Sequence, residues 1–356
     1  MVPPFVMRGV SSPTTWTASE HFAGNVFVWD AEHRAKIHIN SLGLRDREMT
    51  VEKADGVTRI ALMGNSFVEA LQVEQSDTFD DRSEEIFRKS GREVEVVNLA
   101  ISGQTAIEQL VRLEDVGVMF DSDIVVTITR ALDFTSGEMR SDTKWPGYVA
   151  GPSGDLVRGD NFKLSFARRH ANDWKGKALS GALRYSNIAR MLNSAKGKSY
   201  RQILGLERTG APGSVDACSA AEISELHELW VNHSSPENWA ATQKYFQEYS
   251  SIVDELEAVP IYAFREIPIP AGSCVDQIVL RSELIQAAES YIVGLGIKFV
   301  DWDVALQDSD VLKVLGPTDI TVLQGFGREL GVGHYNFDGH QASAEILTNS
   351  VQFALP

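Results

Sequence analysis

Ser66 is the residue of this chain whose type and position best fit nucleophilic chemistry. It follows the apolar run "RIALMG" and precedes an amphipathic segment, so it lies where a strand turns into a helix. A serine there is commonly a helix N-cap, because its hydroxyl accepts an unpaired backbone N–H. It attacks a carbonyl carbon instead when a histidine takes its proton and backbone N–H groups hold the developing oxyanion. The chain must then supply a base and donors at the same place.

Two later segments contain such partners. "NLAISGQT" has Gly103 in a turn after a second apolar run, where a backbone N–H can approach a substrate oxygen closely. "VGHYNFDGH" precedes the last helical segment and contains His334. Alone, a turn glycine and a loop histidine are ordinary structural features. Together with Ser66 at one edge of a sheet, they form the set of groups that acyl transfer requires.

Alternating apolar runs and amphipathic segments predict how these residues are positioned. Five buried strands are expected at 57–64, 93–100, 123–129, 259–266 and 297–303, with helices between them. Such alternation is typical of a parallel sheet covered on both faces. Right-handed crossovers place the C-terminal ends of all strands at one edge, where ligands bind. The predicted fold class is α/β, a three-layer α/β/α sandwich around a five-stranded parallel sheet.

The remaining segments predict additions to this domain. Residues 1–55 contain short alternating runs and are expected to form a β-rich N-terminal extension, and the main domain is expected at 56–356. The segment at about 135–258 is longer than a simple crossover needs, and therefore indicates a large insertion. Within it, 136–162 is expected to be a loop and 179–195 a helix. Residues 66–91 are expected to be mostly helical.

The segments around Ser66, Gly103 and His334 resemble the sequence blocks of the SGNH (GDSL-type) hydrolases. "GNSFVEALQV" is similar to the first block, with Asn65 where the family has Asp, and "NLAISGQT" matches the second block through Gly103. "VGHYNFDGH" is similar to the last block at His334, Asn336, Gly339 and His340. The segment "INSLGLRD" looks like the leader of one bacterial branch. The resemblance covers roughly 37–135 and 255–350.

This resemblance implies a flavodoxin-like fold with the strand order 2-1-3-4-5 and a serine esterase activity. Ser66 would be the nucleophile and His334 the base, while the N–H groups of Ser66 and Gly103 would form the oxyanion hole. Asn65, Asp133 and Asn336 would support the site. No cofactor and no metal ion are implied. Relatives often act on O-acyl groups of carbohydrates, so a small-molecule or carbohydrate ester, including an acetylated polysaccharide, is the expected substrate class.

The sequence departs from the family at two positions that matter for catalysis. The triad Asp is expected two or three residues before the histidine, where this chain has Val332 or Gly331. In the third block, "TRALDF", Leu132 takes the place of the Asn that donates to the oxyanion. Neutralising an orienting carboxylate costs ~10⁴-fold in rate, and losing an oxyanion donor costs ~10²–10³-fold. An active enzyme therefore needs substitutes for both groups.

Several substitutes for the missing carboxylate are compatible with the sequence. A backbone carbonyl, Glu329 or a residue of the insertion could hold His334. A minor alternative pairs Asp338 with His340, although this spoils the match at the last block. Two hypotheses remain: a serine esterase or acyltransferase, and a degenerate domain that binds a glycan or protein partner without catalysis. The two differ in whether Ser66 lies within hydrogen-bond reach of a His334 ring nitrogen.

Other residues near the expected edge give weaker indications. Arg265 and Glu266 follow the fourth strand and are expected to form a surface ion pair or to contact substrate. Trp145 and Tyr148 of the insertion are expected either to stack on a sugar ring or to pack locally.

The composition excludes several classes of protein. The 356 residues carry a formal charge of −16 without a Lys/Arg-rich run, which argues against nucleic acid or an anionic membrane as a main partner. No apolar stretch reaches the ~20 residues that span a bilayer, and the first residues lack the pattern of a signal peptide. The chain is expected to be cytoplasmic as written, or periplasmic or extracellular if an export signal is missing. Cys218 and Cys274 lack metal-ligand spacing and are expected to be thiols, with a single disulfide, which would imply an oxidising compartment, as the alternative. None of these features predicts the oligomeric state.

Overall fold

A computed structural model defines the fold of most of the chain. Of the regions that the sequence analysis singled out, Trp145, Glu266, the helix expected at 179–195 and both cysteines lie outside the described residues. The described residues are 8–9, 20–21, 24, 26–29, 32–130, 134, 147–150, 155–158, 236–265, 286–316, 320–327, 330–331 and 333–355.

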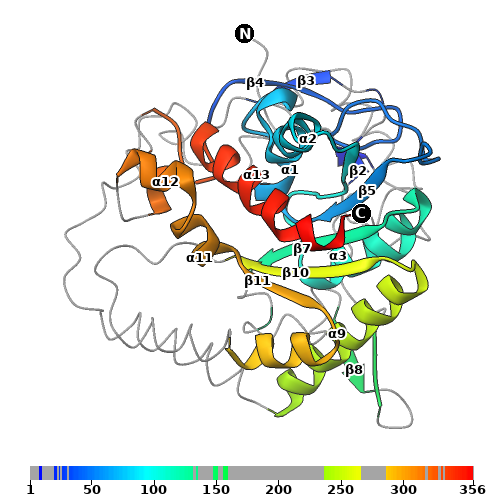
Figure 1. Ribbon diagram of the computed structural model, residues 1–356. Helices are drawn as coiled ribbons and strands as arrows, with labels where there is room; N and C mark the ends of the chain where they lie inside the picture. The colour runs from blue at the N-terminus through cyan, green and yellow to red at the C-terminus, as the bar shows by residue number, and fades with distance from the viewer. Residues whose placement is uncertain are drawn as a thin grey trace, which may run out of the picture.

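A five-stranded, fully parallel sheet forms the centre of the molecule (Figure 1). Its spatial order is β11-β10-β7-β5-β6, which confirms the predicted α/β fold and the strand order 2-1-3-4-5. Each strand is built from β-branched and aromatic residues, which suit a pleated surface that is buried on both faces. The strands are β5 (Thr58–Met63), β6 (Val94–Asn98), β7 (Ile124–Arg130), β10 (Val259–Arg265) and β11 (Lys298–Asp301).

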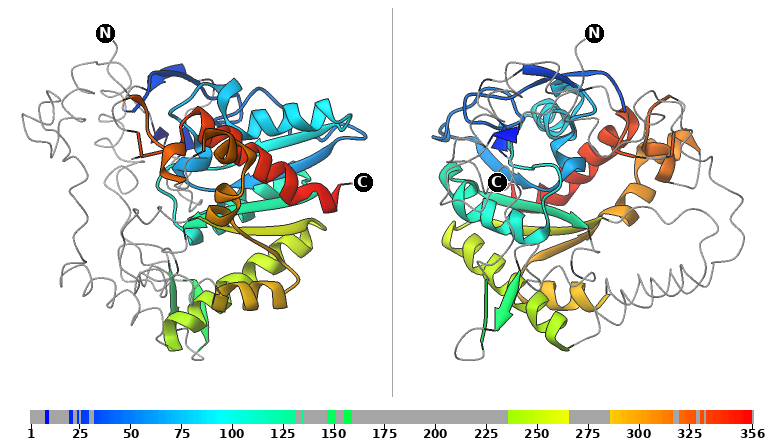
Figure 2. Two further views of the ribbon diagram at one scale, coloured as in Figure 1. Left: turned by 60° about the vertical axis from the view of Figure 1, so that its left-hand side comes forward. Right: turned by 180° about the vertical axis from the view of Figure 1, so that it is seen from behind.

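Alternate residues of each strand pack into two separate cores, one on each side of the sheet. Along β5, Ile60 and Leu62 contribute to one core, whereas Ala61 and Met63 contribute to the other. Because side chains of a strand alternate in direction, this division follows directly from the sequence. The first core is covered by α2 (Phe79–Lys89) and α13 (Phe337–Val351), and the second by α3 (Ala106–Asp115) and α9 (Pro236–Glu255). Figure 2 shows the resulting three layers.

Three short helices complete the first layer and its connections. They are α1 (Ser66–Glu69), α11 (Trp302–Gln307) and α12 (Asp310–Leu315). The segment 66–91, expected to be mostly helical, is divided into α1 and α2, because α1 ends after one turn at Ala70, which has a φ of 57°. A left-handed residue terminates a helix, and the chain then runs to α2 through a short 3-10 turn. No described helix combines the length and apolarity that a membrane span requires.

Short antiparallel strands precede the sheet, as the alternating runs predicted. β1 (Arg8–Gly9) pairs with β2 (Glu20–His21), and β3 (Val26–Trp29) forms a hairpin with β4 (Ala35–His38). In β4 the side chains alternate between buried and exposed, so Ala35 and Ile37 face inward. They form a small core with Ile39 and with Leu71, which follows α1. The hairpin therefore packs on the segment that follows Ser66.

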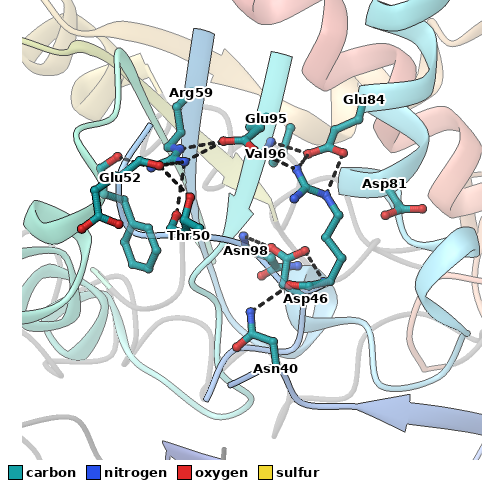
Figure 3. Close-up of polar contacts among 12 residues, drawn as sticks. Asn40, Asp46, Thr50, Glu52, Arg59, Asp81, Glu84, Glu95, Val96 and Asn98 are labelled. Atoms are coloured by element: carbon teal, nitrogen blue, oxygen red, sulfur yellow. Dashed lines mark hydrogen bonds and ion pairs between the residues drawn. The ribbon is translucent and has the colours of Figure 1, made fainter. Parts of the chain in front are cut away.

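The segment 39–52, called the leader below, connects this hairpin to the sheet (Figure 3). Asn40 folds its first turn, because its Oδ1 accepts the backbone N–H of Leu44 at 2.9 Å and its Nδ2 donates to the carbonyl of Arg47. The buried Asp46 accepts the backbone N–H of Asn98, at the end of β6, at 2.8 Å. These bonds hold the leader against the strand that neighbours β5.

Two ion pairs strengthen the same attachment. Arg47 of the leader contacts Glu84 of α2 at 2.8 Å. Arg59 of β5 is 1% exposed, contacts Glu95 of β6 at 2.7 Å, and donates to the carbonyl of Val51 in the leader at 2.6 Å. A buried guanidinium needs such partners for its charge and its N–H groups. The leader is therefore an integral part of the packed structure.

The described part of the insertion contains one hairpin where a loop was expected. β8 (Tyr148–Ala150) pairs with β9 (Leu156–Arg158), and Arg158 contacts Glu114 of α3 at 2.6 Å. Tyr148 is buried and donates to Glu248 of α9 at 2.9 Å, so its ring packs locally and is not available to stack on a sugar.

Candidate active site

Ser66 is the first residue of α1, directly beyond the C-terminal end of β5. The turn between them depends on Gly64, because a Cβ there would collide with the side chain of Val68. Asn65 is the N-cap, and its Oδ1 accepts the backbone N–H of Phe67 at 3.2 Å. The capping role that a serine would commonly take at this turn therefore belongs to Asn65. The hydroxyl of Ser66 is left for another partner.

His334 lies in the loop that leads into α13. Backbone hydrogen bonds hold this loop on both sides of the histidine: its carbonyl accepts the N–H of Gly325 at 2.8 Å, and the N–H of Asn336 donates to Leu323. Asn336 also caps α13 through its Oδ1, and its Nδ2 donates to the carbonyl of Val322 at 2.8 Å. Asn336 therefore joins the histidine loop to the start of α13 and to Val322.

Ser66 and His334 are in direct contact. The hydroxyl oxygen of Ser66 lies 2.8 Å from Nε2 of His334, which is within hydrogen-bond reach. The ring of Phe67 packs against the imidazole with a centroid separation of 4.7 Å. Because the His334 side chain is 22% exposed, the pair is shielded from bulk water on one side and remains accessible on the other. This is the arrangement that a base and its nucleophile require.

A carboxylate lies behind His334, and it comes from the N-terminal extension, in which no catalytic residue was expected. Oε1 of Glu32, in the turn between β3 and β4, lies 2.6 Å from Nδ1 of His334. Its Oε2 accepts the backbone N–H of the same histidine at 3.0 Å. Burial raises the pKa of Glu32, but the hydrogen bonds and charge of His334 outweigh burial and bring the pKa below its usual range. Glu32 is therefore ionised at neutral pH.

The sequence suggested a backbone carbonyl, Glu329 or a residue of the insertion in place of the missing triad Asp, whereas the structure has Glu32 at Nδ1 of His334. Gly331 carries no side chain, and Val332 and Glu329 lie outside the described residues. The local signal for Glu32 in the sequence is weak, because it is one of two acidic residues, with Asp30, between two short predicted strands.

The turn after β6 carries Gly103, the second expected oxyanion donor. Gly103 has a φ of 80°, a conformation that favours glycine. The neighbouring Ser102 donates its backbone N–H to the buried Glu69 of α1 at 2.7 Å, and its hydroxyl donates to the same carboxylate. The N–H of Ile101 donates to the carbonyl of Gly64. The turn is thus attached to the element that carries Ser66, although the oxyanion role itself stays a prediction.

The remaining candidate site residues are Asp338 and His340 of α13 and the two residues of the third sequence block. Asp338 is exposed on the first turn of α13, whereas His340 is buried, with neither ring nitrogen hydrogen-bonded among the described residues. Burial lowers the pKa of His340, so its ring is neutral. The minor alternative of an Asp338–His340 pair is therefore wrong, because no described contact joins the two side chains. Asp133 and Leu132 lie outside the described residues.

Arg265 was expected to form a surface ion pair or to contact substrate. It is instead 2% exposed, at the end of β10. Its guanidinium lies over the ring of Phe67, and its Nε donates to the hydroxyl of Tyr335 at 2.7 Å. Phe67 and Tyr335 are the immediate neighbours of Ser66 and His334 in the chain. Arg265 therefore packs against the chain neighbours of both residues from the C-terminal end of β10.

No group of three or more potential metal ligands occurs among the described residues. The site as described therefore consists of a serine, a histidine and a glutamate that can move or hold a proton, together with backbone N–H groups. This set can carry out covalent catalysis by general base and general acid steps.

Comparisons with known proteins give matches only at the level of solved structures, since no protein-family model and no curated protein matches the chain. A lipase/acylhydrolase from Enterococcus faecalis is 14% identical, with 84% of this chain and 97% of that chain covered and a TM-score of 0.40. An acetyl-xylooligosaccharide esterase from Geobacillus is 12% identical, with 86% and 97% covered and a TM-score of 0.39. A GDSL-like lipase from Bacteroides thetaiotaomicron is 14% identical, with 86% and 93% covered and a TM-score of 0.35.

Proposed function

We propose that the protein is a serine esterase that cleaves or transfers an O-acyl group through Ser66 and His334. The observation that carries this proposal is the 2.8 Å contact between the Ser66 hydroxyl and Nε2 of His334, at the sheet edge where ligands bind in parallel α/β folds. A serine that served only to cap a helix would direct its hydroxyl to a backbone N–H. Here Asn65 makes that bond.

The reaction follows from the positions of these groups. As Ser66 Oγ attacks the ester carbonyl carbon, Nε2 of His334 takes the hydroxyl proton, and the carbonyl oxygen becomes an oxyanion. The backbone N–H groups of Ser66 and Gly103 are the proposed donors to that oxyanion. When the tetrahedral intermediate collapses, the C–O bond to the alcohol breaks and His334 returns the proton to the departing oxygen. Water, or a second alcohol, then attacks the acyl-enzyme with His334 again acting as base.

The substrate class is proposed from the chemistry of the pair and from the resemblance. An O-acetyl group on a carbohydrate is a small ester that this site would accept. Transfer of the acyl group to another sugar uses the same residues and differs only in the acceptor of the second step. The non-catalytic hypothesis was motivated by two missing groups, the oxyanion Asn and the carboxylate behind His334, and Glu32 is a substitute for the second of them.

The test is turnover of p-nitrophenyl acetate and of an O-acetylated glycan by the wild type and by Ser66→Ala. Ser76→Ala is the matched control, because Ser76 is an exposed serine in the turn before α2. The wild type and the control should release acetate, and Ser66→Ala should lose at least ~10³-fold in kcat. Equal rates for all three proteins would refute the proposal and favour a binding domain.

A further inference from the structure

We propose that Glu32 is the residue that orients His334, so that the N-terminal hairpin β3–β4 completes the catalytic site. This inference rests on the proposed esterase function and assigns its missing carboxylate. In this view the extension before the sheet is part of the active site, and the acid of the triad precedes the nucleophile in the chain. Glu32 is a positioning residue, since it acts on substrate only through the imidazole.

The contact between Glu32 and His334 involves both carboxylate oxygens. One accepts from Nδ1 at 2.6 Å, and the other accepts from the backbone N–H of His334 at 3.0 Å. The second bond fixes the carboxylate relative to the backbone, and the first then fixes the plane of the ring. A carboxylate at Nδ1 keeps the proton on that nitrogen and leaves the lone pair of Nε2 directed at Ser66. It also stabilises the imidazolium that forms when Ser66 is deprotonated.

Gly333 makes room for this carboxylate. Its φ is 98°, and a Cβ at this position would lie only 2.8 Å from Oε2 of Glu32. The segment before His334, where the resemblance expects an Asp, therefore contains a glycine against which the side chain of Glu32 fits. Glu32 thus takes the place of the Asp that the resemblance expects two or three residues before His334.

The hairpin is packed against both elements that carry the pair. Beside Glu32, the ring of His33 stacks on Phe326 at 4.7 Å and meets Phe337 edge-on at 5.3 Å, so the turn contacts the histidine loop. At its base, the β4 side chains pack on Leu71, beyond α1. Glu32 is therefore held by contacts on the Ser66 side and on the His334 side, as the precision of a catalytic hydrogen bond requires.

The leader fixes the other end of the hairpin. The buried guanidinium of Arg45 donates to the carbonyl of Val73 at 2.7 Å and also to Gln75, which ties the leader to the segment after α1. Asp46 is bound to β6 and Arg47 to α2, so the leader is attached to the sheet and to its covering helix just after β4. These contacts explain how a residue outside the sheet can reach the histidine in a defined orientation.

The first readout of the test is kinetic and uses the full chain. Glu32→Gln keeps the size of the side chain but removes its charge, and its amide can donate to Nδ1 and stabilise the wrong tautomer. We expect kcat for p-nitrophenyl acetate to fall ~10²–10⁴-fold with KM little changed, and Glu32→Asp to recover part of the loss. Glu74→Gln, which neutralises an exposed glutamate, is the control. A kcat for Glu32→Gln equal to that of Glu74→Gln would overturn the inference while leaving the esterase function intact.

The second readout does not depend on turnover. In ¹⁵N-histidine-labelled protein, long-range ¹H–¹⁵N NMR spectra report which ring nitrogen of His334 carries the proton. The wild type should hold neutral His334 as the Nδ1–H tautomer, and Glu32→Ala should shift it towards Nε2–H. An unchanged tautomer in Glu32→Ala would refute the inference even if the wild type proved inert. Lack of Ser66-dependent turnover together with the expected tautomer shift would refute only the proposed function.

Discussion

Replacing Gly333 with Ala is expected to disturb the Glu32–His334 contact, and so to lower kcat, with little effect on the stability of the fold. A Cβ at 333 would lie 2.8 Å from Oε2 and 3.2 Å from Cδ of Glu32. Because these atoms belong to the end of a flexible side chain, the carboxylate can move away at little cost in folding free energy. The displaced carboxylate would, however, no longer hold the imidazole of His334 in its present orientation.

The size of the effect follows from the distances. Ordinary van der Waals contact begins near ~3.4–3.5 Å, so the carboxylate must retreat by about 0.6 Å. The Glu32–Nδ1 separation, now 2.6 Å, would then be about 3.2 Å, which is longer than the ~2.7–2.9 Å of a charge-assisted hydrogen bond. A misplacement of about 1 Å at a catalytic group costs ~10²-fold, and complete loss of the orienting carboxylate costs ~10⁴-fold. We therefore expect kcat to fall by ~10–10²-fold.

Gly331→Ala is the matched control for this substitution. Gly331 has a φ of 92°, close to that of Gly333, so an alanine at either position carries a similar backbone strain of about 1–2 kcal/mol. A Cβ at 331, however, has its nearest neighbours in Thr321 at 3.9 Å and touches nothing in the site. The assay is kcat for p-nitrophenyl acetate beside the midpoint of urea unfolding for both variants. Similar midpoints with a kcat loss confined to Gly333→Ala are expected, whereas equal activity in the two variants would refute the reasoning.

Three further substitutions test other parts of the structure. Burial raises the pKa of Asp80 to about 6, above its ordinary value of 3.8, so this group stabilises the fold at low pH and loses that contribution as the pH rises through 6. Asp80→Asn should remove about 3 kcal/mol of the difference in unfolding free energy between pH 4 and pH 8, measured in urea, while Asp81→Asn on the same turn should not. Asn336→Ala should lower the unfolding free energy by about 1–2 kcal/mol through loss of the α13 cap, and equal stability in urea would contradict that role. Glu69→Ala should release the Ser102 turn and lower kcat more than KM changes; a variant with normal kcat would show that the turn is held by other contacts.

The parallel sheet was predictable because apolar runs alternate with amphipathic segments, and its strand order was predicted from the resemblance of the sequence blocks. These patterns are local, and the rules for crossovers then leave few topologies. The break between α1 and α2 within the mostly helical segment 66–91 was not predicted, because a single left-handed residue ends α1 and no apolar periodicity signals it. The hairpin β8–β9 was missed for a related reason, since its strands are only three residues long.

The pair Ser66–His334 could be foreseen from the sequence because both residues lie directly next to regular elements. Ser66 follows β5 and His334 precedes α13, so the topology alone brings them to one edge of the sheet. The buried state of Arg265 could not be foreseen, because an arginine at the end of a strand is equally compatible with solvent. Only the packing of Phe67 and Tyr335 around it decides its place.

The sequence by itself determined the fold class, the strand order and the two residues proposed to exchange a proton. Only the tertiary structure decided what stands behind the histidine. Glu32 and His334 are 302 positions apart, and no spacing rule connects a glutamate in a turn with a histidine near the other end of the chain. Their contact depends on how the leader, the hairpin and the histidine loop pack together. That packing is set by non-local contacts, which a local pattern of residues does not predict.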